Sequence, residues 1–235
     1  MSVISKPPIE YYYDSHLTEE DLMGYNALQA RLATYILALL RWMFRGEGWF
    51  IALDLNIYLT PAPDEVPTVP DVAVYKGVVL DEEQEARVLS WRIDPPEAPP
   101  PAVVFEVASK DTWQKDLNDK PEIYARMGVR EYVYLDARLK RPAGSPGLRV
   151  WRMADGRAIE LPADESGRVW SDELQSWLVP EAGWLRLYER SGLMRLTGEE
   201  TERAAKEVER ELKERAWAAL RKLGVDPENL PAARE

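Results

Sequence analysis

Hydrophobic residues recur with two different periods along the first half of the chain. From residue 18 to about residue 45 they return every third or fourth position, which predicts a long amphipathic helix, and Gly46 ends it. Short apolar or alternating runs, bounded by proline and glycine, predict strands instead. These runs cover residues 49–60, 71–79, 101–109 and 129–137, and a short helix at 116–128 precedes the last of them.

This order of helix, three strands, helix and strand predicts an α/β domain of the α+β type, with a mixed sheet flanked by helices. Residues 148–187 contain further short strand-like pieces, which we expect to extend that sheet. A charged helix at 197–224 follows, so we predict a domain at 1–196 and a helix with its tail at 197–235. Apolar residues recur along this helix in a coiled-coil-like seam, which fits either packing on its own domain or a protein partner. They are Ala205, Val208, Leu212, Ala216, Ala219 and Leu223.

The composition excludes several kinds of chemistry. The chain of 235 residues has no cysteine and a single histidine, His16, in a polar N-terminal segment where we expect it to do no chemistry. Disulfides, thiolate catalysis, histidine-based triads and zinc sites built on cysteine and histidine are therefore excluded. Any metal would be held mainly by oxygen ligands, which favours Mg²⁺, Mn²⁺ or Ca²⁺.

Charge and hydropathy limit the partners and the location. The net charge of −11 argues against a broad surface that coats DNA nonspecifically, but it permits a local basic patch. No apolar run approaches the ~18 residues of a membrane span, and the first residues lack the pattern of a signal peptide. We therefore expect no membrane association, and the lack of cysteine fits a cytoplasmic location.

One carboxylate stands in the middle of a predicted buried strand, PAVVFEVASKD at residues 101–111. Side chains alternate across a strand, so Glu106 shares a face with Val104 and Ala108. A carboxylate buried among such residues is costly unless it neutralises, pairs with a cation or binds a metal. Glu106 is therefore a candidate for chemistry.

A second carboxylate and a lysine are placed where they can join Glu106. Asp71 opens another apolar strand, and if the two strands are neighbours both carboxylates converge at one edge of the sheet. Together with the Val107 carbonyl and water they would form a Mg²⁺ site, to which Lys120 of the next helix would bring a cation. The alternative is structural: Asp71 caps a strand end, and Glu106 pairs with Lys110 or Lys120.

Four pieces of sequence follow one another in a characteristic order. They are Pro70-Asp71, then FEVAS at 105–109, then Asp116, Lys120 and Tyr124, then GVREYVYLD at 128–136. Their order and spacing resemble the Uma2 family of endonucleases, formerly a domain of unknown function, in the PD-(D/E)XK nuclease superfamily. The resemblance runs from about Leu17 to Thr197 and implies a restriction-endonuclease-like nuclease domain over residues 1–196.

The resemblance also implies roles for individual residues. Asp71 and Glu106 would be the metal ligands, for Mg²⁺ or Mn²⁺. The usual lysine position of the superfamily is Ala108 here, and Lys120 on the following helix would instead stabilise the charge that develops on the phosphate. The supporting positions would be Ser109, Lys110 as a second candidate cation, Asp116 and Tyr124.

Three functions remain open at this point. The favoured one is a Mg²⁺-dependent endonuclease that acts on DNA phosphodiesters, as a homodimer. The second is a catalytically degenerate nuclease fold used as a binding or assembly module, which the charged C-terminal helix supports, as do Tyr25 and Gln29 where relatives carry an acid and a histidine. The third is a phosphoesterase for a small nucleotide, which would have a closed pocket. A DNA substrate would need a basic groove, expected from Lys76, Arg87, Arg92, Lys110, Lys115 and Arg126.

Overall fold

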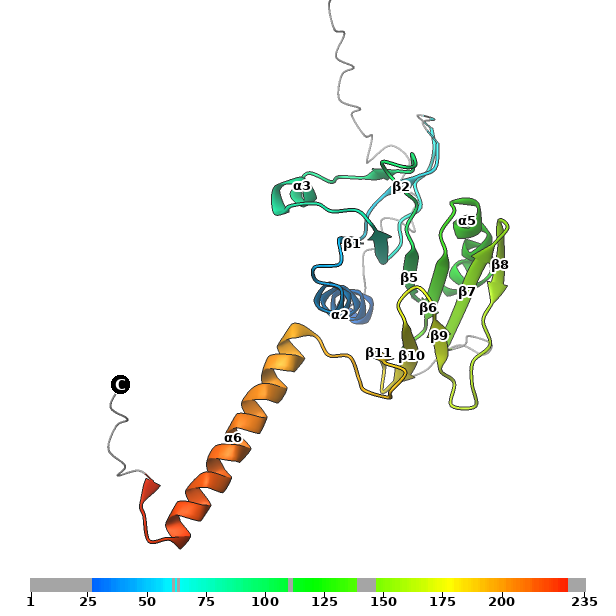
Figure 1. Ribbon diagram of the computed structural model, residues 1–235. Helices are drawn as coiled ribbons and strands as arrows, with labels where there is room; N and C mark the ends of the chain where they lie inside the picture. The colour runs from blue at the N-terminus through cyan, green and yellow to red at the C-terminus, as the bar shows by residue number, and fades with distance from the viewer. Residues whose placement is uncertain (1–26, 61, 63, 110–111, 139–146, 228–235) are drawn as a thin grey trace, which may run out of the picture. The chain divides into compact units, whose positions relative to one another are not determined.

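The computed structural model describes residues 27–60, 62, 64–109, 112–138 and 147–227. Its main sheet has six strands: Trp49–Leu53 (β1), Val72–Lys76 (β3), Val103–Val107 (β5), Glu131–Leu135 (β6), Leu148–Ala154 (β7) and Arg157–Glu160 (β8). Their spatial order is β1-β3-β5-β6-β7-β8 (Figure 1). All neighbours are antiparallel except β5 and β6, which are parallel. The predicted mixed α/β fold is thus confirmed.

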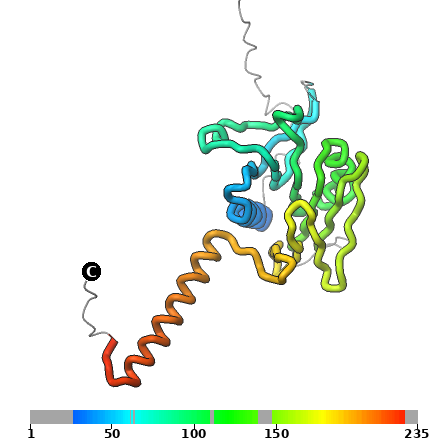
Figure 2. The backbone as a smooth tube through the Cα atoms, in the orientation of Figure 1, coloured from blue at the N-terminus to red at the C-terminus, as the bar shows by residue number. Residues whose placement is uncertain are grey.

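Helices flank this sheet. The helix α2 (Ala27–Met43) buries its apolar positions in one core cluster, together with residues of β3, β5 and β6. The short helices α4 (Trp113–Asn118) and α5 (Lys120–Arg126) supply residues to a second cluster. They form the crossover between the parallel strands β5 and β6, a path that can be followed in green in Figure 2. The predicted part of the first helix before residue 27 lies outside the described residues.

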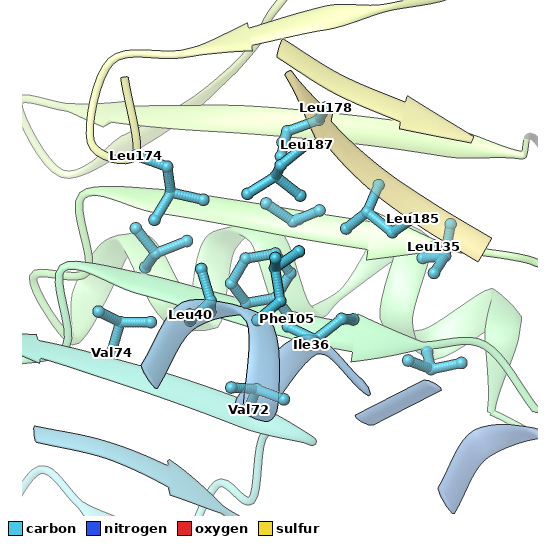
Figure 3. Packing of buried hydrophobic residues seen from close by; sticks show 14 of the residues in the cluster. Ile36, Leu40, Val72, Val74, Phe105, Leu135, Leu174, Leu178, Leu185 and Leu187 are labelled. Carbon is cyan, nitrogen blue, oxygen red and sulfur yellow. The ribbon is translucent and has the colours of Figure 1, made fainter. Parts of the chain in front are cut away.

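The alternation predicted for the strand with Glu106 is confirmed. Val103, Phe105 and Val107 belong to the α2 side of the core, where Phe105 packs near Ile36 (Figure 3). Val104 belongs to the opposite cluster, as does Ala108 just beyond β5. Every residue of β5 is buried, because the strand lies inside the sheet and both of its faces are covered.

The predicted strand at 49–60 is two elements. The chain turns at Asp54, which has a positive φ of 47°, and β2 (Ile57–Tyr58) leaves the main sheet to pair in parallel with β4 (Trp91–Arg92). Alternation alone gave no sign of this turn. Between β3 and β4 lies the short helix α3 (Glu82–Ala86), which begins with a capping box.

The predicted helix at 116–128 is also interrupted. It is divided into α4 and α5 at Asp119, because Pro121 has no N–H to continue a single helical ladder. Lys120 is the first residue of α5, and Asp119 is its N-cap. Gly128, with φ of 79°, follows the end of α5.

The C-terminal strands extend the sheet only in part. While β7 and β8 join the main sheet, β9 (Val169–Ser171), β10 (Ser176–Glu181) and β11 (Trp184–Tyr188) form a separate antiparallel sheet. The prediction that all of these strands extend one sheet is therefore wrong. Leucines that alternate along the small sheet bury its inner face in the α2 side of the core (Figure 3): Leu178, Leu185 and Leu187.

The chain divides into two compact units, residues 1–195 and 196–235. The second contains α6 (Gly198–Lys222), which begins with a capping box formed by Thr197 and Glu200. None of the α6 side chains is buried, and the predicted seam residues Val208 and Leu212 are exposed. Among the described helices, none has both the length and the apolar character needed to cross a membrane.

Candidate metal centre

The antiparallel pairing of β3 with β5 brings the two predicted carboxylates together. Val72 pairs with Phe105, so one residue further along this register Asp71 stands across from Glu106. Opposite residues of an antiparallel pair share a face of the sheet. Only 5% of Asp71 and 4% of Glu106 is exposed, which makes both carboxylates part of the protein interior.

Hydrogen bonds to two other elements hold the Asp71 carboxylate. The backbone N–H of Val107 donates to Asp71 Oδ2 at 2.5 Å, and the amide Nε2 of Gln29 on α2 lies 3.4 Å from Asp71 Oδ1. This bond lies just beyond the end of β3, where Val107 stands opposite Pro70 in the continued register. The Asp71 side chain thus accepts a backbone N–H of β5 at the end of β3 and is fixed by it.

The Glu106 carboxylate is held from the helix side of the sheet. The Tyr124 hydroxyl donates to Glu106 Oε1, and the Lys120 ammonium lies 2.8 Å from the same oxygen. Lys120 also lies 2.8 Å from Oδ1 of Asp116. These three helix residues follow one another at intervals of four positions, so they share one face although the helix is interrupted between α4 and α5.

A further layer of hydrogen bonds fixes Asp116. The Thr112 hydroxyl donates to Asp116 Oδ2 at 2.8 Å, and the Tyr132 hydroxyl donates to the Asp116 backbone carbonyl at 2.8 Å. Ser109 Oγ accepts the Thr112 N–H at 3.0 Å, and the two hydroxyl oxygens lie 2.8 Å apart. Ser109 thus contacts the start of α4, and Thr112 links it to Asp116.

Burial governs the protonation of this cluster. It raises the pKa of Glu106 to about 8; the nearby Lys120 lowers that pKa, and the negative charges of Asp116 and Asp71 add to the rise. For Lys120, burial alone would lower the pKa, but the ion pairs with Glu106 and Asp116 outweigh it and raise the pKa above its usual range. Burial likewise raises the pKa of Tyr124, which is therefore a neutral donor.

The described side chains of the cluster include more carboxylates than cations. Among the described side chains it holds three carboxylates, Asp71, Glu106 and Asp116, and one cation, Lys120, in the contacts given above. If all three carboxylates are ionised, their formal charge together with the ammonium is −2, which is the charge that one divalent cation neutralises. Clusters of buried carboxylates with perturbed pKa values are typical of sites that bind metal or take part in catalysis.

The donor atoms fit a hard divalent cation. A strand residue points its N–H and its carbonyl to the same neighbour, so the Val107 carbonyl faces the end of β3, where Pro70 has no N–H to offer it. In the described parts of the chain no three side chains of His, Cys, Asp and Glu form a metal-holding group. Mg²⁺ needs only one or two protein carboxylates, because it keeps water and takes substrate oxygens.

Comparison with known families decides the affiliation. Residues 6–179 match the model of Uma2, described as "Putative restriction endonuclease". The chain belongs to the Uma2 family. The resemblance predicted from the motifs is thus confirmed over most of its predicted length.

Among solved structures, the Uma2 chain is similar to the "Crystal structure of a putative nuclease belonging to DUF820 from Anabaena variabilis ATCC 29413". The two are 12% identical with a TM-score of 0.45, over 64% of this chain and 75% of that chain. A search among curated proteins gives no match.

In this Uma2 protein five of the predicted site residues lie together: Asp71, Glu106, Asp116, Lys120 and Tyr124. Ser109 is connected to them through Thr112. Lys110, the second candidate cation, lies outside the described residues, as do His16 and Tyr25. The structural alternative also predicted a pair between Glu106 and Lys120, so the pair alone does not choose between the two interpretations.

Three contacts of the cluster were missed by the sequence interpretation: those of Gln29, Thr112 and Tyr132. Thr112 stands four residues before Asp116, and this spacing would have predicted their contact, since residues four apart are neighbours on a helix. No local pattern pairs Gln29 with Asp71 or Tyr132 with Asp116. The expected basic groove also changes, because Lys76 lies at the far end of β3 from Asp71 and is paired with Glu173 at 2.8 Å.

Proposed function

We propose that this Uma2 protein is an endonuclease that hydrolyses phosphodiester bonds of DNA with the help of Mg²⁺ or Mn²⁺. The observation that carries the proposal is the meeting of Asp71 and Glu106 on paired strands, with Lys120 2.8 Å from Glu106. Membership of the family supports the class of reaction. The described residues include no histidine and no cysteine, which fits chemistry that relies on oxygen ligands.

Asp71, Glu106 and the Val107 carbonyl would hold the cation. When bound, it would polarise a phosphoryl oxygen and make water more acidic, so hydrolysis would need no histidine. The protein's own part is to hold the carboxylates still: Gln29 and the Val107 N–H orient Asp71, and the Tyr124 hydroxyl orients Glu106.

Lys120 would act on the phosphate. Its ammonium is positioned between Glu106 and Asp116, and the Thr112 hydroxyl in turn orients Asp116. An ammonium that is fixed before the reaction stabilises negative charge on the phosphate without costly reorganisation. Asp116 is therefore a positioning residue in this proposal, and Ser109 supports it through Thr112.

The test is cleavage of plasmid and of labelled oligonucleotides in Mg²⁺, in Mn²⁺ and in EDTA. We expect the wild type to cut only with metal and Glu106→Gln to lose about a hundredfold or more of the rate. The matched control is Glu122→Gln, which makes the same change on the exposed side of α5 and should cut like the wild type. Equal rates for Glu106→Gln and the wild type would overturn the proposal.

A second candidate is a nuclease fold that has lost its activity and serves as a binding or assembly module. The ion pair of Lys120 with Glu106 and the amide of Gln29 beside Asp71 favour it, since both stabilise the carboxylates without metal. Such a protein would gain no thermal stability from Mg²⁺ or Mn²⁺, whereas the endonuclease would. A homodimer, or a partner that binds α6, is a further expectation of either function.

A further inference from the structure

A cavity of about 550 Å³ lies where α2, the end of β6 and the small sheet meet. Two of the residues that line it are arginines, Arg31 on α2 and Arg138 just after β6, and Trp184 forms an aromatic wall. This volume is in the usual range for a small-molecule site and is large enough for a single nucleotide unit. The other lining residues are Leu28, Ala137, Ala182 and Gly183.

The cavity belongs to the same edge of the sheet as the carboxylate cluster. The strands β5 and β6 are parallel neighbours, so their carboxyl ends lie side by side, about 5 Å apart in the hydrogen-bonding direction. The end of β5 carries Glu106 and Val107, and the residues just after β6 line the cavity. The helix α2 contributes to both the cluster and the cavity: its Gln29 lies near Asp71, and its Arg31 lines the cavity.

Arg31 gives the cavity its positive charge. Its guanidinium lies 4.7 Å from the centre of the Trp184 ring, a cation–π distance, and the residue is exposed. Among the described residues no carboxylate forms an ion pair with it, although the chain carries a net charge of −11. Arg138 differs, because both its Nε and its Nη2 bind Asp136, at 2.8 and 2.6 Å. Arg31 is therefore the cation available to a ligand.

The hairpin turn between β10 and β11 forms another wall of the cavity. Ala182 and Gly183 form the two-residue turn between β10 and β11, and both have positive φ angles, 49° and 79°. This is the pattern of a type I′ hairpin turn, in which an alanine is strained. A Cβ atom on Gly183 would lie 3.8 Å from the Ala137 carbonyl oxygen, so the turn packs closely against the chain after β6. The cavity is thus formed before any ligand arrives.

We propose that this cavity binds a backbone phosphate of the DNA strand, next to the phosphodiester held at Asp71 and Glu106. The proposal rests on the proposed function and adds to it the contact that positions the strand. Arg31 forms the charge-assisted hydrogen bonds to the phosphate, and Trp184 holds the guanidinium in place and provides an apolar wall for the attached nucleoside. The basic contact therefore lies on the α2 side of the cluster.

The test is the binding of a fluorescein-labelled DNA oligonucleotide, followed by anisotropy at several salt concentrations in EDTA, which keeps the substrate uncut. The parent protein is the wild type, and Arg31→Gln is made in it. We expect affinity to fall about tenfold and the salt dependence to lose about one counterion. The control is Arg45→Gln, since Arg45 is also exposed and also lies over an indole, that of Trp42 at 3.9 Å.

The outcomes separate this proposal from the proposed function. If Arg31→Gln binds DNA like the parent, or if Arg45→Gln weakens binding as much, the cavity proposal is overturned while cleavage by the wild type is unaffected. If Arg31→Gln alone weakens binding but the wild type never cuts, the phosphate site is supported and the hydrolase is not. If the parent binds no DNA at all, the cavity proposal fails.

Discussion

The ammonium of Lys120 lies 2.8 Å from Oε1 of Glu106, inside the protein, and so joins the first residue of α5 to the middle of the sheet. A buried ion pair of this kind has two consequences. Removing one partner leaves the other charge without compensation. It also places a fixed cation beside two carboxylates, which the proposed hydrolysis would use. Stability and metal binding therefore have to be measured separately.

Lys120→Met tests the structural consequence. It leaves Glu106 and Asp116 buried without their cation, and we expect a loss of about 3 kcal/mol in the free energy of unfolding in EDTA. Mn²⁺ should restore part of this loss, because it replaces the missing positive charge. Urea unfolding with and without Mn²⁺ measures both effects. The control Lys206→Met, in an exposed pair on α6, should change nothing measurable. A loss for Lys120→Met no larger than the control would contradict the account.

Tyr124→Phe tests the hydroxyl that orients Glu106. The substitution keeps the ring in the core and removes only the donor to a buried carboxylate, so we expect a loss of about 1–2 kcal/mol. Chemical denaturation measures it. In the control Tyr188→Phe the lost hydroxyl bonds Glu181 at an exposed site, where water takes its place. Equal losses in the two variants would mean that the Tyr124 hydroxyl contributes no more than a surface bond.

Much of this arrangement could be predicted from the sequence. The alternation along β5 predicted that Glu106 shares a face with Val104 and Ala108, and the order of motifs predicted that Asp116, Lys120 and Tyr124 belong with it. Two kinds of feature were not predictable. The contact of Gln29 with Asp71 depends on how α2 packs on the sheet, and the turn at Asp54 depends on a backbone angle that alternation does not reveal.

The separate sheet of β9, β10 and β11 was missed for a similar reason. Its strands have the same composition and length as strands that extend a sheet, and only the packing of Leu178, Leu185 and Leu187 against the α2 side of the core distinguishes them. Strand patterns predict which face is buried. They do not predict against which layer that face packs.

The pH dependence of stability should show the effect of Glu131. This buried carboxylate accepts bonds from the Ser171 hydroxyl and from the N–H groups of Asp172 and Glu173, and Arg152 lies 3.7 Å away. Burial nevertheless raises the pKa of Glu131. The hydrogen bonds from Ser171, Glu173 and Asp172 lower this pKa, and the charge of Glu173 raises it, so that the net shift is upward. The folded state thus binds the proton more tightly than the unfolded state.

The stabilising contribution of Glu131 is complete below its ordinary pKa of about 4.5, and it is lost as the pH rises through the raised value in the folded protein. Glu131→Gln does not titrate, so its stability relative to the wild type should improve from pH 4 upward. Thermal unfolding of both proteins from about pH 4 to 8 measures this. A difference that stays constant across the range would refute the assignment.

The turn beside the cavity offers a stabilising substitution. Ala182 has a φ of 49°, which an L residue with a Cβ adopts at a cost of about 1 kcal/mol and glycine adopts freely. Ala182→Gly should therefore raise the unfolding free energy by about 0.5 kcal/mol, after the larger entropy of glycine in the unfolded chain is subtracted. Ala158 lies in the strand β8 and has no positive φ, so Ala158→Gly should destabilise the protein. Destabilisation by both substitutions would show that Ala182 is not strained.

The most direct test of the central claim is calorimetric titration of Mn²⁺ into the wild type, Asp71→Asn and Glu106→Gln. We predict that the wild type binds Mn²⁺ in the micromolar to millimolar range and that each variant loses the binding, because each removes one of the two carboxylates of the centre. Glu122→Gln should bind like the wild type. If the wild type takes up no metal, even with a DNA oligonucleotide present, the carboxylate cluster is structural and the protein is not a metal-dependent nuclease.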